Sequence, residues 1–282
     1  MRSMCFAKNA LVIFGLLAVS NLVSPAHACG PDSDCVIGDR TYRIRMPEGH
    51  DGKTPVGAVF YMHGYKGSAR NVMRNKGMGK AVSDMGLALI APKSAFDDWA
   101  IPNSPSRKTP VELEYFDALI EDVTTRFPID RKRILATGFS AGGMMVWNLI
   151  CHRSEMFTAF APISGTFWAP TPQTCDTPPA HVFHTHGKTD RVVPLKGRAI
   201  ASTRQGNVFE VLEMYRTYGS YQPSEKYTRG DLECEGWKNA DGKMMEFCLH
   251  PRGHDMRSKY FINVWKKLEG LGKLAAAPKS DG

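Results

Sequence analysis

The sequence predicts an α/β fold built on a mostly parallel, doubly wound sheet with helices on both faces. One observation is that short apolar runs of strand length recur along the chain, at residues 56–62, 87–91, 134–137, 181–185 and 244–249. Runs that are apolar throughout are expected for strands covered on both faces by helices. A second observation is that segments of helical length separate these runs, and such alternation favours parallel strands joined by helical crossovers.

The remaining elements follow from local patterns. Residues 42–46 alternate between apolar and basic side chains, which predicts a half-exposed strand near an edge of the sheet. Two proline-bearing segments, residues 93–110 and 168–179, are predicted as loops over the strand ends, where such sheets bind ligands. Residues 222–241 are predicted to be irregular and held by their own disulfide. Helices are predicted at residues 68–85, 111–127, 141–152, 197–218 and 256–268.

The first 28 residues differ from the rest of the chain. Basic residues precede an uncharged, largely apolar stretch over residues 9–23, and Ala26-His27-Ala28 fits an A-x-A cleavage site. This pattern is typical of a signal peptide, because the apolar run falls short of the roughly 20 residues that span a bilayer. We expect cleavage after Ala28, a secreted or periplasmic protein, and a single domain at residues 29–282. A membrane anchor and a lipid on Cys29 are the alternatives.

Charge and cysteine content narrow the class of protein further. The formal net charge is +8, but Lys and Arg are scattered singly, so neither a nucleic-acid partner nor, after cleavage of the leader, a membrane partner is expected. An even number of cysteines follows the leader, which predicts disulfides in an exported chain. Fifteen pairings are possible, and pairing of neighbours closes the shortest loops. No C-x-x-C spacing occurs, so no metal is expected. The six cysteines are Cys29, Cys35, Cys151, Cys175, Cys234 and Cys248.

A candidate nucleophile lies in Gly138-Phe139-Ser140-Ala141-Gly142, which matches G-x-S-x-G. The match alone is weak in a chain with 26 glycines. Its context is stronger, because the motif follows the predicted strand at 134–137 and opens the predicted helix at 141–152. That strand-turn-helix corner is the nucleophile elbow of α/β hydrolases, in which the turn holds the serine in a strained conformation. We therefore predict Ser140 as the nucleophile, the alternative being an ordinary glycine-rich turn.

A serine hydroxyl needs a base, and the base needs a group that orients it. In α/β hydrolases the acid and then the histidine come later in the chain. Asp190 follows the predicted strand at 181–185, and His254 follows the one at 244–249. We predict Asp190 as the orienting carboxylate and His254 as the general base. Asp176 and Asp231 are the rival acids and His250 is the rival base, whereas His152, His181 and His184 are expected to be packing or surface residues.

The developing oxyanion needs backbone N–H donors. Ala141 is predicted to supply one from the start of its helix. The predicted strand at 56–62 runs into His63-Gly64-Tyr65-Lys66-Gly67, where glycines allow a close approach of the backbone, so Tyr65 is predicted to supply the other. Trp99, Phe167 and Trp168 lie in loops expected to face the site and are candidates, with Tyr65, for an apolar acyl pocket.

At these residues the chain resembles a family of extracellular α/β-hydrolase esterases that includes poly(3-hydroxybutyrate) depolymerase-like and feruloyl esterase-like enzymes. The resemblance is densest at residues 127–165, in Phe-Pro-Ile-Asp-Arg-Lys-Arg-Ile, Gly-Phe-Ser-Ala-Gly-Gly-Met-Met and Ala-Pro-Ile-Ser-Gly. It extends to His63-Gly64, to His186-Gly187 with Asp190, and to Gly253-His254. It implies the same three catalytic residues. Family members often carry more glycines before the histidine and a tryptophan soon after it, which this chain lacks, so the substrate stays open.

Together these patterns predict a serine esterase that uses no cofactor and acts on a small-molecule or oligomeric ester. The acyl group is a hydroxyalkanoate, a cinnamate such as ferulate, or acetate on a polysaccharide. A serine peptidase of the same fold and a catalytically inactive binding protein are the alternatives.

Overall fold

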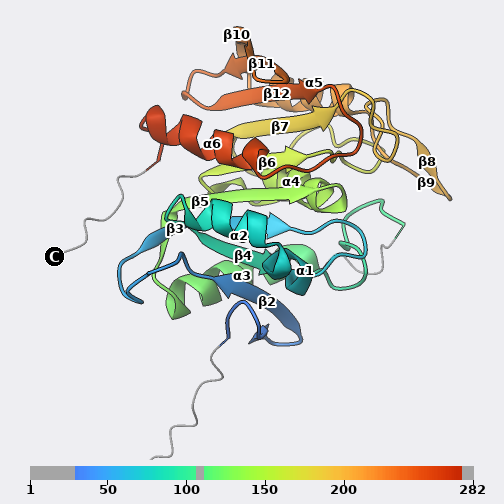
Figure 1. Ribbon diagram of the computed structural model, residues 1–282. Helices are drawn as coiled ribbons and strands as arrows, with labels where there is room; N and C mark the ends of the chain where they lie inside the picture. Colours follow the sequence, from blue (N-terminus) through green and yellow to red (C-terminus); the bar gives the residue numbers. More distant parts are fainter. Residues whose placement is uncertain (1–28, 106–110, 275–282) are drawn as a thin grey trace, which may run out of the picture.

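The computed structural model describes residues 29–105 and 111–274, and one sheet of ten strands runs through them. The strand order is β1-β2-β4-β3-β5-β6-β7-β12-β11-β10, with β2 near one end of the sheet and β10 at the other (Figure 1). Six central strands, β4, β3, β5, β6, β7 and β12, are parallel to their neighbours in that group, and the strands at both ends are antiparallel. The predicted fold class is confirmed, because this is a mostly parallel sheet between helical layers.

The strands of the sheet have the following bounds: β1 Cys35–Ile37, β2 Arg40–Arg45, β3 Val56–Met62, β4 Ala88–Pro92, β5 Ile129–Phe139, β6 Ala159–Ile163, β7 Val182–Gly187, β10 Gln222–Arg229, β11 Leu232–Lys238 and β12 Met244–His250. A separate two-stranded hairpin is made of β8 Ala199–Ile200 and β9 Thr203–Arg204. The central strands are buried almost throughout, as the apolar runs predict.

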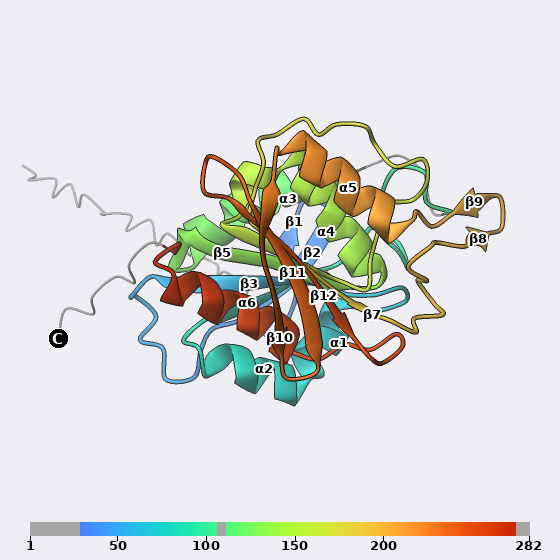
Figure 2. The ribbon, with the colours of Figure 1, turned by 90° about the horizontal axis from the view of Figure 1, so that it is seen from above.

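The helices form two layers, one on each face of the sheet. Helices α3, α4 and α5 pack into one apolar cluster, and α1, α2 and α6 pack into another, as the view from above shows (Figure 2). Their bounds are α1 Ala69–Arg74, α2 Lys76–Ser83, α3 Glu112–Arg126, α4 Ala141–His152, α5 Val208–Tyr218 and α6 Lys259–Gly270, with a 3-10 turn at Ser154–Met156. In the described ranges no helix is both long and apolar enough to cross a bilayer.

Four expectations about elements need correction. The helix predicted at 68–85 is divided at Asn75, whose side chain accepts a hydrogen bond from Met78 N–H and caps α2. Residues 197–218, predicted as one helix, contain the β8–β9 hairpin followed by α5. Residues 222–241 are not irregular, because they contain the antiparallel strands β10 and β11. Strand β6 was not predicted, although it lies in the middle of the sheet.

Three disulfides join neighbouring cysteines: Cys29–Cys35, Cys151–Cys175 and Cys234–Cys248. The third links β11 to β12, where the two cysteines are directly paired across the strands. Residues 222–241 are therefore held by a disulfide, as predicted, and this bond ties their second strand, β11, to β12. The predicted leader, residues 1–28, lies outside the described residues.

Candidate active site

Ser140 occupies a sharp corner between β5 and α4. Its backbone has φ 58° and ψ −120°, a left-handed conformation that is costly for a residue with a side chain. The corner packs tightly on the end of β3, since a Cβ added at Gly142 would lie 2.0 Å from the carbonyl oxygen of Met62. The motif therefore needs its glycine for a steric reason, and the strained serine is held by the sheet on which it sits.

Asp190 lies just after β7 and is buried, with 6% of its surface exposed. Its Oδ1 accepts hydrogen bonds from the backbone N–H groups of Val192, at 2.8 Å, and Val193, at 2.9 Å. Its Oδ2 lies 2.7 Å from His254 Nδ1. Burial works to raise the pKa of Asp190, but the bonds from His254 and Val193 outweigh it and hold the pKa below its ordinary value. Asp190 is thus a carboxylate at neutral pH, and its Oδ2 accepts a hydrogen bond from the Nδ1–H group of His254.

A directed chain of buried hydrogen bonds supports the loop that holds Asp190. Trp147 Nε1 donates to His184 Nδ1 at 3.1 Å, His184 Nε2 lies 2.9 Å from His186 Nδ1, and His186 Nε2 lies 2.8 Å from Val193 O. An indole nitrogen only donates, so each histidine carries its proton on Nε2 and passes the same polarity along the chain. Burial lowers the pKa of both histidines, that of His186 to about 4, which keeps them neutral. This series of hydrogen bonds holds the backbone of Val193 in place, and the N–H of Val193 donates to Asp190 Oδ1.

The loop carrying His254 is packed against the loop carrying Asp190. A Cβ added at Gly187 would lie 2.1 Å from Gly253 O, so the two backbones touch there. Lys188 N–H donates to His250 O at 2.9 Å. The His254 ring lies against the ring of Phe139, with centroids 4.4 Å apart. Phe139 directly precedes Ser140, so this contact brings the imidazole to the nucleophile corner.

The structure joins Asp190 to His254 directly, but the Ser140 hydroxyl has no hydrogen-bond partner among the described residues. Hydrogen bonds between catalytic groups are often long in a free enzyme and shorten when substrate binds. Two of the three residues predicted from sequence, Asp190 and His254, are therefore joined by a hydrogen bond. The third, Ser140, directly follows Phe139, whose ring contacts the ring of His254.

The backbone N–H groups of Tyr65 and Ala141 have no acceptor among the described residues. They lie close to Ser140, because a Cβ added at Gly64 would be 3.6 Å from Ser140 Cβ and because Ala141 opens α4. The loop after β3 is clamped from behind: Lys66 N–H donates to Asp97 O at 2.7 Å, and Trp99 Nε1 donates to His63 O at 2.8 Å. Free N–H groups on a fixed loop beside a nucleophile are what an oxyanion hole requires.

Ser140 opens into a cavity of about 320 Å³. Most of its wall is apolar or aromatic, and its polar side chains besides Ser140 and Tyr65 are Asp98, Arg198 and Gln205. The lining residues are Tyr65, Asp98, Pro105, Ser140, Ala141, Met144, Trp168, Val192, Arg198, Ile200 and Gln205. A largely apolar pocket with a few polar groups is the usual form of a small-molecule site.

Comparison with known proteins shows which proteins this chain resembles in sequence and in fold. Residues 96–229 match the family model described as phospholipase/carboxylesterase. The chain is 28% identical over 269 residues to a probable feruloyl esterase C of Aspergillus niger, and the aligned part covers 88% of this chain and 91% of that one. It is 30% identical over 168 residues to feruloyl esterase C of Emericella nidulans, covering 57% and 58% of the two chains. It also superposes on an acetyl xylan esterase from Aspergillus awamori with a TM-score of 0.61 at 14% identity, over 86% of this chain and 96% of that one.

The chain has the α/β-hydrolase fold. Its relatives in sequence are esterases, which supports ester hydrolysis as the activity of this hydrolase.

The two rival acids are paired with other side chains, and the rival base is buried in the fold. Asp176 lies 2.6 Å from His152 Nδ1, and Asp231 pairs with Arg252 and with Lys259. His250 is fully buried and stacks on Tyr260. None of these contacts leads to the cavity.

Two of the residues predicted for the acyl pocket lie outside the lining of this cavity. Trp99 is fully buried and lies behind the loop that follows β3, where its indole N–H donates a hydrogen bond to His63 O. Phe167 is also buried and packs on Trp147, at 5.8 Å between centroids. Neither lines the cavity, whereas Trp168 and Tyr65 do. Sequence reasoning missed Asp98, because it looked for aromatic residues in the loop at 93–110, and missed Arg198, Ile200 and Gln205, because their segment was predicted as helix.

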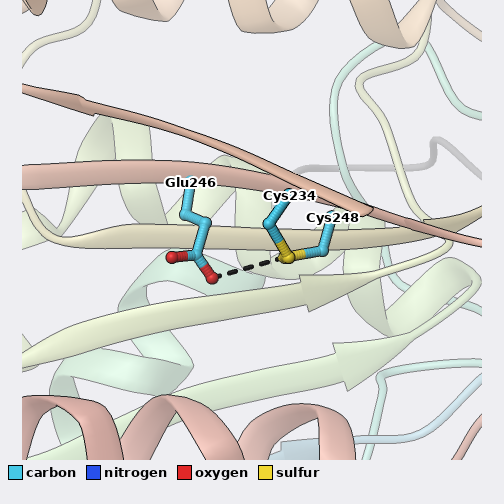
Figure 3. A group of neighbouring side chains, drawn as sticks. All are labelled: Cys234, Glu246 and Cys248. Carbon is cyan, nitrogen blue, oxygen red and sulfur yellow. Dashed lines mark hydrogen bonds between the residues drawn. A yellow bond between two sulfur atoms is a disulfide. The ribbon is translucent and has the colours of Figure 1, made fainter. Parts of the chain in front are cut away.

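A second group of side chains resembles a metal site in composition. Cys234, Glu246 and Cys248 lie together on β11 and β12, but the two sulfur atoms are bonded to each other (Figure 3). A cysteine binds metal as a free thiolate, so this oxidised group has no cysteine ligand to offer. The buried Glu246 carboxylate instead accepts a hydrogen bond from Tyr227 OH at 2.6 Å and pairs with Lys267.

Proposed function

We propose that this hydrolase is a serine esterase that cleaves carboxylic esters through an acyl-enzyme on Ser140. His254 acts as general base and Asp190 orients the histidine. The N–H groups of Tyr65 and Ala141 form the oxyanion hole. The observation that carries this proposal is the 2.7 Å contact of His254 Nδ1 with Asp190 Oδ2, beside a serine held at φ 58°.

The proposed reaction follows from the donors and acceptors in the site. Asp190 holds the proton of His254 on Nδ1, so Nε2 is free to accept the proton of Ser140 as Oγ attacks the ester carbonyl. The oxygen of the tetrahedral intermediate takes hydrogen bonds from the two backbone N–H groups. The bond to the alcohol breaks, and His254 returns its proton to the leaving oxygen. Water then attacks the acyl-enzyme by the same route and releases the acid.

We propose hydroxycinnamoyl esters as the preferred substrates, ahead of hydroxyalkanoate and acetyl esters. The names of the relatives most similar in sequence, feruloyl esterases, support this choice. The cavity supports it as well, since its wall includes the aromatic rings of Trp168 and Tyr65, against which an aromatic acyl group can pack.

Export of the chain is part of the proposal. Three disulfides support an oxidising compartment, because such bonds persist outside the cytosol. The leader pattern at residues 1–28 is the second support. Expression of the whole gene with a C-terminal tag, followed by N-terminal sequencing of the protein outside the cytosol, tests it. We expect a new terminus at Cys29, and a protein retained in the cytosol at full length contradicts it.

Kinetics on a panel of substrates test the activity. We expect methyl ferulate to be hydrolysed with a higher kcat/KM than methyl acetate or a hydroxybutyrate oligomer, and we expect no cleavage of dipeptide amides. Cleavage of amides at a comparable rate would assign a peptidase instead. Absence of all activity from protein with intact disulfides would leave a binding protein of the same fold.

A further inference from the structure

Asp98 is a carboxylate in the wall of the cavity that contains Ser140. Only 8% of its surface is exposed. The apolar side chains of Met144, Trp168 and Ile200 form other parts of the same wall. A buried acidic group in such surroundings normally has a cation or several hydrogen-bond donors around it.

The two oxygens of Asp98 differ. Oδ1 accepts a hydrogen bond from the N–H of the next residue, Trp99, at 2.8 Å. Oδ2 has no hydrogen-bond partner among the described residues, and no ion pair joins it to a cation there. Oδ2 is not fully buried, so it keeps access to the cavity whose wall Asp98 helps to form. One oxygen is therefore used by the fold and the other is left for something that enters.

This arrangement costs the folded protein free energy. Burial raises the pKa of Asp98 to about 6, with Glu112 adding to the rise and the Trp99 N–H opposing it. A group held in an unfavourable state without a local compensating partner is a candidate for a role in binding.

The position of Asp98 is fixed by its loop. Glu112 Oε1 accepts hydrogen bonds from Ala95 N–H, at 3.1 Å, and from Ala100 N–H, at 3.0 Å, on the two sides of Asp98. Arg40 pairs with the other oxygen of Glu112 at 2.6 Å. The same loop holds the loop after β3, because Trp99 Nε1 donates a hydrogen bond to His63 O. Asp98 is thus set rigidly relative to the reacting centre, as a specificity contact must be.

We propose that Asp98 Oδ2 accepts a hydrogen bond from a hydroxyl group of the bound ester, which makes Asp98 a specificity-determining residue for hydroxylated substrates. The inference rests on the proposed esterase function and deepens it. The hydroxyl belongs either to the acyl group, as in a 4-hydroxycinnamate, or to the alcohol, as in a sugar or glycol ester. A carboxylate only accepts, so an ester without a hydroxyl leaves Oδ2 buried against it and unpaired, which is the physical basis for discrimination.

The test compares matched esters with and without the hydroxyl. One pair is methyl 4-hydroxycinnamate and methyl cinnamate, and the other is 2-hydroxyethyl cinnamate and propyl cinnamate. The variants are Asp98→Ala, which removes the acceptor, and Asp98→Asn, which keeps a neutral one. Asp97→Asn is the matched control, because Asp97 is the neighbouring carboxylate, is exposed, and does not line the cavity.

We expect the wild-type protein to favour the hydroxylated ester in at least one pair. Asp98→Ala is expected to lower that preference about 10- to 100-fold, the range for a hydrogen bond to a charged group, with Asp98→Asn between the two and Asp97→Asn unchanged. The first pair places the hydroxyl on the acyl side, and the second places it on the alcohol side.

Two results would overturn the inference. Wild type that shows no preference in either pair leaves Asp98 without a role in recognition. Equal losses on all four esters in Asp98→Ala show that the residue only supports the loop. A protein that cleaves none of the esters and is not labelled at Ser140 by a fluorophosphonate removes the esterase function itself, and this outcome is distinct from an active enzyme with an unchanged preference.

Discussion

Two hollows of this hydrolase differ in size and in chemistry. The larger, about 930 Å³, lies between α5 and strands β10, β11 and β12, and the smaller, about 320 Å³, lies beside Ser140. The charges on the larger hollow are paired, with Lys226 on Glu235 and Arg216 on Glu213, both at 2.6 Å. The smaller one holds a strained serine and a carboxylate, Asp98, that has no ion-pair partner in the part of the chain that the structure describes. The site that we propose is therefore marked by strained and unpaired groups and not by the larger volume.

The largest effect is expected from the nucleophile. Ser140→Ala is expected to lower kcat on methyl ferulate by about 10⁴-fold or more, because no other group in the site attacks the carbonyl. Thr228→Ala is the matched control, since it removes a hydroxyl from the larger hollow. A rate that falls equally in both variants would erase the distinction between the two hollows.

The next effect concerns the orienting acid. Asp190→Asn is expected to lower kcat about 10³- to 10⁴-fold by allowing the wrong tautomer of His254, whereas Asp176→Asn, on a surface pair with His152, is expected to change it less than about twofold. Steady-state kinetics measure both. If Asp190→Asn keeps more than a tenth of the activity, the acid has been misassigned.

The contribution of the Asp190 carboxylate to the free energy of unfolding is expected to depend on pH. The folded pKa of Asp190 is below its ordinary value of 3.8, so the ionised group stabilises the fold fully above that value and the contribution is lost as pH falls through the folded pKa. The free energy of unfolding of wild type relative to Asp190→Asn is expected to shrink as pH falls below about 3.8, as urea titrations would show. A gap that widens there contradicts the assignment.

A disulfide on the larger hollow should affect stability and not rate. Replacing Cys234 and Cys248 together with alanine is expected to lower the free energy of unfolding by about 3 kcal/mol, the figure for a loop of roughly this length. Below the melting transition, kcat/KM is expected to stay within about twofold. A large loss of activity in folded protein would show that the two hollows are coupled.

The smallest effect is expected from a surface pair. Lys226→Ala breaks the exposed pair with Glu235 on the larger hollow and is expected to change stability by about 1 kcal/mol or less, with no change in kcat/KM. Thermal unfolding and the ferulate assay measure both quantities. A drop in activity on esters attached to a polymer alone would give the larger hollow a role in binding.

The parts of the molecule that sequence predicted well are those with local causes. The corner at Ser140 follows from glycines whose side chains would collide with β3, and the buried strands follow from their apolar runs. Asp190 and His254 were reached because each follows such a strand. The bond between them, in contrast, is a consequence of the packing of Gly187 on Gly253, which no local pattern reveals.

The parts that were missed depend on the path of the whole chain. Strand β6 contains Pro162, which argues against a central strand, yet it lies between β5 and β7. The β8–β9 hairpin interrupts a segment of helical length and brings Arg198 and Ile200 to the cavity. Trp99 can be buried because its indole N–H donates a hydrogen bond to His63 O, behind the loop that follows β3. The proline-rich loop in which Trp99 lies does not reveal this contact in the sequence.

The central claim is that Ser140 is the nucleophile activated by the pair of His254 and Asp190. Mass spectrometry of protein treated with a fluorophosphonate, followed by peptide mapping, tests it most directly. The account predicts one adduct, on Ser140, formed rapidly in wild type and about 10³-fold or more slowly in His254→Ala. An adduct on another residue, or labelling of Ser140 at an undiminished rate without His254, would contradict it.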